Sequence, residues 1–197
     1  MAESRIFVVL LFFTAGTACA QHVSCKTNYY AVTGSNFREI HQSFRASRTW
    51  RDTGGHEGFT VWNVSWRFDT LSNGSVCRMS TFSTTTTIAI TLPRWVAPTN
   101  ATDALKAEWT RYIQALGKHE YGHAQLALAA AGEIQKKIRE VPDDPSCDSL
   151  KQRVSGLCEG IIQKFKGLDT AYDEKTNHGL NAGARLGRWE SPRSPPQ

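Results

Sequence analysis

Two histidines four residues apart, with a glutamate directly after the first, form an H-E-x-x-H pattern at His119, Glu120 and His123. On a helix, residues four apart project from the same face, so both imidazoles can bind one metal ion. Glu120 is rotated by one residue, which places its carboxylate beside the ion, where it can take a proton from water. The pattern predicts a zinc site with Glu120 as general base. Its competitor is a chance match formed by two core histidines.

A catalytic zinc needs a third protein ligand, and the helix that carries the pattern does not supply one. Ala129 stands where a further histidine could follow, six residues after His123. Glu133 lies about three turns beyond His123, too far along the helix axis to share the ion. The third ligand must therefore come from another element.

The end of the next predicted helix, "AYDEKTNHG" at residues 171–179, offers three candidates. We rank His178 first, because a helix that stops at Gly179 leaves His178 able to turn back toward the ion. Asp173 ranks second; it could instead accept a hydrogen bond from a ligand histidine. Glu174 ranks third. His178 could also act as a cation near the helix C-terminus rather than as a ligand.

The H-E-x-x-H pattern lies in a long helix expected from about residue 102 to residue 140. Thr102 and Asp103 can cap its start, and apolar residues recur at three- and four-residue steps. His119 and His123 fall on this apolar stripe. "VPDDPSC" then breaks the helix, and a second amphipathic helix follows. We therefore expect two antiparallel helices that pack together.

The preceding residues favour strands. "VSCKTNYYAVTG", the alternating "FTVWNVSWRF" and the β-branched "VCRMSTFSTTTTIAITL" predict a sheet, with a hairpin turn at "SNGS". Between the first two strands, Ser35 can cap a short helix whose apolar stripe includes His41, which we interpret as packed or surface-exposed rather than as a ligand. The predicted fold is α+β: a small antiparallel sheet with a short helix, then the two long helices.

The first twenty residues have the form of a secretory signal peptide. A short n-region and the apolar run "IFVVLLFF" precede small residues at Ala18 and Ala20, so we expect cleavage before Gln21. The run is shorter than the roughly 18 residues that span a bilayer. We expect no membrane span, one domain over residues 21–187, a disordered tail over residues 188–197, and a secreted or periplasmic location.

Four cysteines remain after the predicted cleavage, an even number that favours disulfides in an oxidising compartment. No C-x-x-C pair is present to build a tetra-cysteine zinc site. We expect Cys25 to pair with Cys77, since both lie in strand-like sequence, and Cys147 to pair with Cys158, since they bracket a helix start.

The formal net charge is +5, and the basic residues are spread along the chain rather than clustered. This distribution gives no support to nucleic-acid binding. We expect a monomer whose partner is a peptide or protein substrate, or a cell-envelope polymer.

The chain resembles a family of secreted bacterial zincin-like proteins, described as Zn-dependent proteases and built on a domain of unknown function. The resemblance covers nearly the whole mature chain, and its most specific part is the combination of "HEYGH" with "YDEKTNHG". It implies an α+β zincin-type domain with His119, Glu120 and His123 in the site. The second motif marks five further positions: Tyr172, Asp173, Thr176, His178 and Gly179.

The expected activity is zinc-dependent hydrolysis of an amide bond. Zinc lowers the pKa of water to about 7, and Glu120 takes the proton and later passes it to the leaving amine. Tyr172, or His178 if it is not a ligand, could donate to the oxyanion. Two other classes remain: an exported binding or scaffolding module whose structural zinc is bound by both Asp173 and His178, and a hydrolase acting on peptidoglycan.

Overall fold

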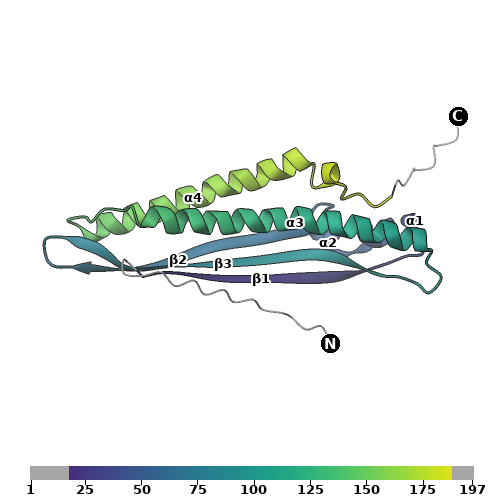
Figure 1. Ribbon diagram of the computed structural model, residues 1–197, viewed down its shortest axis with the longest axis horizontal. Coiled ribbons are helices and arrows are strands. Elements are labelled where there is room, and N and C mark those ends of the chain that lie inside the picture. Colours follow the sequence, from purple (N-terminus) through teal and green to yellow (C-terminus); the bar gives the residue numbers. More distant parts are fainter. Residues whose placement is uncertain (1–17, 188–197) are drawn as a thin grey trace. The chain divides into compact units, whose positions relative to one another are not determined.

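The computed structural model describes residues 18–187 (Figure 1). Most of the predicted signal peptide and the whole predicted tail lie outside the described residues. Ala18 to Ala20, the last three residues of the predicted signal, begin the first strand. In chain order the elements are β1 (Ala18–Thr33), α1 (Phe37–Ala46), α2 (Arg48–Asp52), β2 (Phe59–Ser72), β3 (Cys77–Val96), α3 (Asp103–Ile138), α4 (Cys147–Thr176) and a 3₁₀ turn (Leu180–Ala182).

The three strands form one sheet in the order β1-β3-β2. A four-residue turn joins β2 to β3 as the predicted hairpin, and Asn73 stabilises it by accepting hydrogen bonds from the backbone of Ser75 and Val76. The expectation of an all-antiparallel sheet is wrong, because the sheet is mixed. β1 reaches its place beside β3 through a long crossover that contains α1, α2 and β2, a connection that parallel pairing requires and that a hairpin pattern cannot reveal.

The helices agree with the predicted class, and the mixed α+β architecture is confirmed. The cap of α1 is Asn36 rather than Ser35: the Asn36 side chain accepts from the Glu39 backbone N–H at 3.0 Å. Ser35 instead donates to the Glu39 carboxylate. In the part of the chain described here, no helix has the length and apolar character needed to cross a membrane.

Two compact units divide these elements. The first unit takes residues 60–89 of the hairpin and residues 122–172 of the long helices, together with the start of β1. In it α4 returns alongside α3, and Lys164 on α4 pairs with Glu133 on α3 at 2.7 Å. Gln135 on α3 donates to the Thr84 hydroxyl of β3 at 3.0 Å, deep in the core. The predicted antiparallel packing of the two helices is present here.

The second unit takes residues 27–59, 90–121 and 173–187. Its core contains the apolar stripe of α1, with Phe44 stacked against Trp109 of α3. Arg111 on α3 donates to the backbone carbonyls of Gly183 and Arg185, which fastens the chain after α4 to α3. His41 is half-buried, with its Nε2 atom 3.0 Å from the Leu186 carbonyl, so its packing role agrees with the sequence interpretation.

A disulfide joins Cys77 to Cys147, with their Cα atoms 5.1 Å apart. Both predicted pairings are therefore wrong: Cys25 is exposed and Cys158 buried, and neither is joined to another cysteine. The cause is a two-residue bridge between the start of β3 and the loop after α3, where Cys77 and Asp144 exchange backbone hydrogen bonds of 2.7 and 2.9 Å. This bridge brings the start of α4 to the hairpin.

Candidate metal centre

The H-E-x-x-H residues lie on the buried side of α3. His119, Glu120 and His123 are 4, 3 and 5 % exposed, although all three are polar. Burial of three such side chains is costly unless each has partners, so their position demands an explanation. Because α3 is continuous through this stretch, the two imidazoles stand one turn apart on one face, as predicted.

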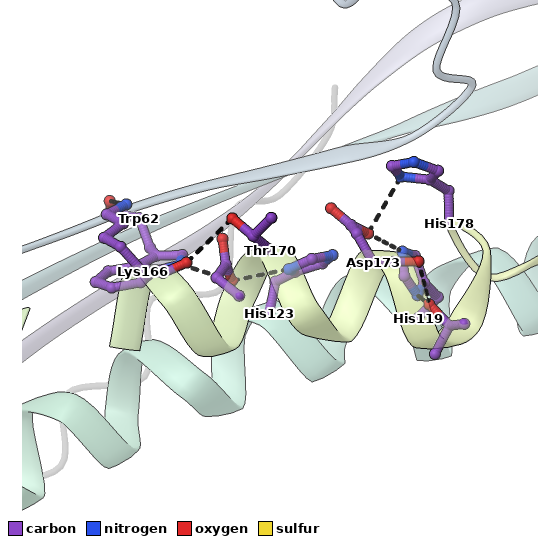
Figure 2. A network of polar contacts seen from close by, with 9 residues as sticks. Trp62, His119, His123, Lys166, Thr170, Asp173 and His178 are labelled. Carbon is purple, nitrogen blue, oxygen red and sulfur yellow. Dashed lines mark hydrogen bonds and ion pairs between the residues drawn. The ribbon is translucent and has the colours of Figure 1, made fainter. Parts of the chain in front are cut away.

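Asp173, near the end of α4, completes a group of three ligand-capable residues. Its Oδ1 atom lies 3.1 Å from Nε2 of His119 (Figure 2). One ligand atom from each of His119, His123 and Asp173 lies within 4.8 Å of the others. Two imidazole nitrogens and a carboxylate oxygen at this spacing can hold one metal ion.

His119 is held in place from two sides. Its Nδ1 atom lies 3.4 Å from the Thr176 hydroxyl, on the side away from Asp173. Gly179 packs against the ring: a β-carbon there would lie 2.9 Å from Cγ of His119, and the φ of Gly179 is 79°. A side chain at this position would meet both strain and collision. Thr176 and Gly179 of the second motif therefore act by positioning His119.

His123 is oriented by a carboxylate. Its Nδ1 atom lies 2.8 Å from Oδ1 of Asp169, which also accepts a hydrogen bond from Nε1 of Trp62 at 3.0 Å. Burial raises the pKa of Asp169, but the hydrogen bonds from His123 and Trp62 outweigh it and hold that pKa below its ordinary value. An ionised carboxylate on Nδ1 directs Nε2 toward a metal, the usual arrangement around ligand histidines.

Tyr172 packs edge-on against His123, with ring centroids 5.0 Å apart. Its hydroxyl lies against the backbone of α3 at Gly122, where a β-carbon would be 2.3 Å from the oxygen. The predicted catalytic role of Tyr172 stays a prediction. What the structure adds is a packing reason for the glycine inside "HEYGH".

His178 lies beside Asp173 rather than in the three-residue group found among residues 18–187. Its Nδ1 atom is 3.4 Å from Oδ1 of Asp173, and its side chain is 49 % exposed. The helix ends before it, and Asn177 and His178 both have φ near 50°. The predicted turn back from the helix end is therefore present. It places His178 against Asp173 rather than among the three ligand-capable residues. Glu174 is exposed.

Two neighbours of this centre were missed from the sequence. Asp169 precedes Asp173 by four residues, the same spacing as the two histidines, so a search for paired carboxylates on α4 could have found it. His56 lies between α2 and β2, and its ring centroid is 4.5 Å from that of His178. No local pattern marks His56, because only the fold brings it to the helix end.

The fold and the site together define an α+β protein with a His-His-Asp cluster on a helix pair, in which the two histidines are buried and the aspartate is partly exposed. The chain belongs to the family described as "Bacterial protein of unknown function (DUF922)", whose model matches residues 27–179. This match includes every residue of the candidate centre. No curated protein matches the chain. No solved structure matches it either.

Proposed function

We propose that this protein is an exported zinc-dependent hydrolase, and that its substrates are peptides. The observation that carries the proposal is the three-residue group, in which ligand atoms of His119, His123 and Asp173 lie within 4.8 Å of one another. Two histidines and a carboxylate match the three-ligand sets of catalytic zinc sites, which leave a coordination position open. Glu120 is buried directly beside this group and supplies a base.

The donor set favours zinc over the common hard cations. Magnesium and calcium prefer oxygen ligands, whereas two imidazoles suit zinc and its transition-metal neighbours. Both histidines also have partners on their other nitrogen, Asp169 for His123 and Thr176 for His119. Such partners fix the ring orientation and support metal binding.

Asp173 is the third ligand in this proposal, in place of His178. Its Oδ1 atom is 3.1 Å from Nε2 of His119, whereas His178 is half-exposed, lies 3.4 Å from the same Oδ1 atom and is not in the three-residue group found among the described residues. His178 then serves to orient the Asp173 carboxylate. Donation from Nδ1 of His178 to Asp173 would leave Nε2 of His178 directed away from the carboxylate.

The chain's own residues carry the proton transfers. When bound, zinc supplies a Lewis acid that polarises a carbonyl group and lowers the pKa of water. Glu120 accepts the proton of the attacking water while the new carbon–oxygen bond forms. The carbon–nitrogen bond then breaks, and Glu120 passes its proton to the leaving nitrogen. Burial keeps bulk water from competing for this carboxylate.

Export is supported by two observations. The Cys77–Cys147 disulfide is of the kind that persists in oxidising compartments. The first twenty residues have the composition of a secretory signal, although most of them lie outside the described residues. We place the protein in the periplasm or outside the cell.

Metal analysis joined to one substitution tests this function. Purified protein should carry about one zinc per chain, and Glu120→Gln should keep that zinc while hydrolysis of a mixed fluorogenic peptide pool falls by roughly 10²–10⁴-fold. Glu174→Gln, on the exposed side of α4, is the matched control and should leave both unchanged. Wild-type protein that takes up no zinc on titration would contradict the proposal.

The contact between His178 and Asp173 favours one second candidate, a binding module with a structural zinc. That function requires His178 to be a fourth protein ligand, so that no position stays open for water. Cobalt substitution separates the two: a site with an open position changes its visible spectrum when azide is added, and a closed site does not.

Peptidoglycan fragments belong in the same substrate screen as the peptides, since hydrolysis of an amide bond is the reaction in both cases.

A further inference from the structure

The segment His56–Gly58, between α2 and β2, reaches the candidate centre at two points. A β-carbon on Gly58 would lie 3.2 Å from Oε1 of Glu120, so this backbone runs directly past the proposed base. Two residues earlier, the His56 ring lies 4.5 Å from the ring of His178, which contacts Asp173. Two residues span at most about 7 Å of chain. His56 is therefore close to both the base and the carboxylate ligand.

This segment is held firmly by its middle residue. The Glu57 carboxylate accepts a hydrogen bond of 2.7 Å from the hydroxyl of Tyr112, which is fully buried on α3. The Glu57 carbonyl accepts another, of 2.6 Å, from the hydroxyl of Tyr30 on β1. The His56 backbone N–H donates to the hydroxyl of Thr53. A side chain on such a backbone is preorganised, as a group that stabilises a transition state must be.

An imidazole in this place can donate a hydrogen bond without carrying charge. Neutral histidine always keeps one N–H. Burial lowers the pKa of His56, the neighbouring His178 lowers it further, and Asp173 offsets part of the shift. A neutral imidazole donor is suited to a carbonyl oxygen that gains negative charge as water adds to the carbon. Tyr172, the donor expected from the sequence, has its hydroxyl packed against Gly122.

Building on the function proposed above, we propose that His56 is a catalytic residue whose N–H hydrogen-bonds to the oxygen of the substrate carbonyl. As the water oxygen bonds to the carbonyl carbon, the π electron pair of the carbonyl moves to the carbonyl oxygen. His56 stabilises the negative charge on that carbonyl oxygen. Glu120 takes the water proton. When the carbon–nitrogen bond breaks, the pair returns to re-form the carbonyl, and the nitrogen takes the proton from Glu120. His178 is a positioning residue that packs against His56.

The test compares two ligands on the zinc-loaded, full-length protein. A phosphinic dipeptide presents a tetrahedral centre with two oxygens, one of which occupies the oxyanion position, whereas a simple alkyl thiol presents only a metal-binding atom. His56→Phe keeps the ring but loses the N–H and should weaken phosphinic dipeptide binding by about 10- to 100-fold. It should leave thiol binding and zinc content unchanged. His56→Gln, which keeps an N–H donor, should restore much of the loss.

The control is His22→Phe, which replaces an exposed histidine near the start of β1 and should alter neither ligand. Equal phosphinic dipeptide affinity in wild type and His56→Phe overturns the proposal, because the ring alone would then suffice. Equal weakening of both ligands by His56→Phe also overturns it, because the effect would be structural. Failure of the function itself is seen separately, in wild-type protein that binds no zinc.

Discussion

The hydroxyl oxygen of Tyr172 lies 2.3 Å from the point where a β-carbon on Gly122 would stand. No heavier residue fits between α3 and the Tyr172 ring without moving one of them, and that ring packs edge-on against His123. The second of the two variable positions in "HEYGH" is therefore constrained by the partner helix, while the first, Tyr121, is 53 % exposed.

Gly122→Ala should displace the Tyr172 ring and weaken zinc binding, although alanine is the better helix former. We expect a loss of about 1–3 kcal/mol in the free energy of unfolding from the overpacked contact. Gly132→Ala is the matched control on the same helix, because nothing lies within 4 Å of its β-carbon position. That variant should be stabilised by up to about 1 kcal/mol. Urea unfolding of the two variants compares their free energies of unfolding. Equal stabilisation of both would contradict this prediction, because Tyr172 would then move aside with no loss of stability.

Asp173→Ala should lose zinc to a mild chelator, and His178→Ala should keep it. The reason is that Asp173 belongs to the three-residue group found among the described residues, whereas His178 contacts Asp173 without being a member of that group. Removal of a ligand leaves two histidines, a much weaker site. A competition assay with a chromogenic chelator ranks the variants directly. The reverse ranking would restore the original expectation that His178 is the third ligand.

Asp169→Asn should lower zinc affinity by about 10- to 100-fold without removing any ligand. The substitution keeps the shape of the side chain but replaces the carboxylate that faces Nδ1 of His123 at 2.8 Å. Trp62→Phe serves as the control for the other hydrogen bond on Asp169 and should have a smaller effect. Zinc titration by calorimetry measures both. An affinity unchanged in Asp169→Asn would show that His123 needs no charged partner.

Sequence reasoning reached the parts of this molecule that depend on local pattern. The spacing of His119 and His123 and the apolar stripe around them are properties of one helix, and they place both imidazoles on its buried face. The third member of the group depends on how α4 meets α3, which local spacing does not encode. Asp173 was therefore only one of several candidates until the structure showed it next to His119. His56 belongs to no local sequence pattern and was not a candidate at all.

The cysteine pairing failed for a related reason. Similarity of predicted secondary structure suggested Cys25 with Cys77, but a disulfide needs proximity, and proximity here comes from the backbone bridge between Cys77 and Asp144. The mixed sheet was missed in the same way: a strand's alternation of side chains shows which face is buried, but not which neighbour it has or in which direction that neighbour runs.

Loss of the Cys77–Cys147 bond should cost about 4 kcal/mol, since it closes a loop of 70 residues in the unfolded chain. The double variant Cys77→Ser/Cys147→Ser isolates this effect, and Cys25→Ser, at an exposed position, should leave stability unchanged. Chemical unfolding with and without reductant measures the difference. Peptide mapping of the unreduced protein should return the Cys77–Cys147 peptide; a Cys25–Cys77 peptide would contradict the structure.

Glu57→Gln should stabilise the metal-free protein increasingly as the pH rises. Burial raises the pKa of Glu57 above its ordinary 4.5, and the hydrogen bond from Tyr112 and the nearby His41 offset only part of this. The folded protein thus holds that proton more tightly than the unfolded chain does, and wild-type stability falls as the pH rises from 4.5 through the folded-state pKa. The variant lacks this loss.

Glu39→Gln is the control of opposite sign. Hydrogen bonds from the Ser35 backbone and side chain, with one from Asn36, lower the pKa of Glu39. Wild-type protein therefore gains stability from Glu39 as the pH rises, and the gain is complete above 4.5. Urea unfolding between about pH 2.5 and pH 8 should show Glu39→Gln falling below wild type in stability as the pH rises toward 4.5, and Glu57→Gln rising above wild type as the pH rises beyond 4.5. Parallel pH profiles for both would contradict the assigned environments.

The order of the cysteines along the chain bears on how the protein would mature if it is exported as proposed above. Cys25 and Cys77 emerge from the membrane before Cys147, so an oxidase that acts on the translocating chain meets a pair that the finished protein does not contain. Where a Cys25–Cys77 bond forms at that stage, native pairing needs a later exchange, in which the Cys147 thiolate attacks at Cys77 and releases Cys25 as a thiol. Yield in an expression host should consequently depend on a disulfide isomerase, and replacement of Cys25 should remove that dependence.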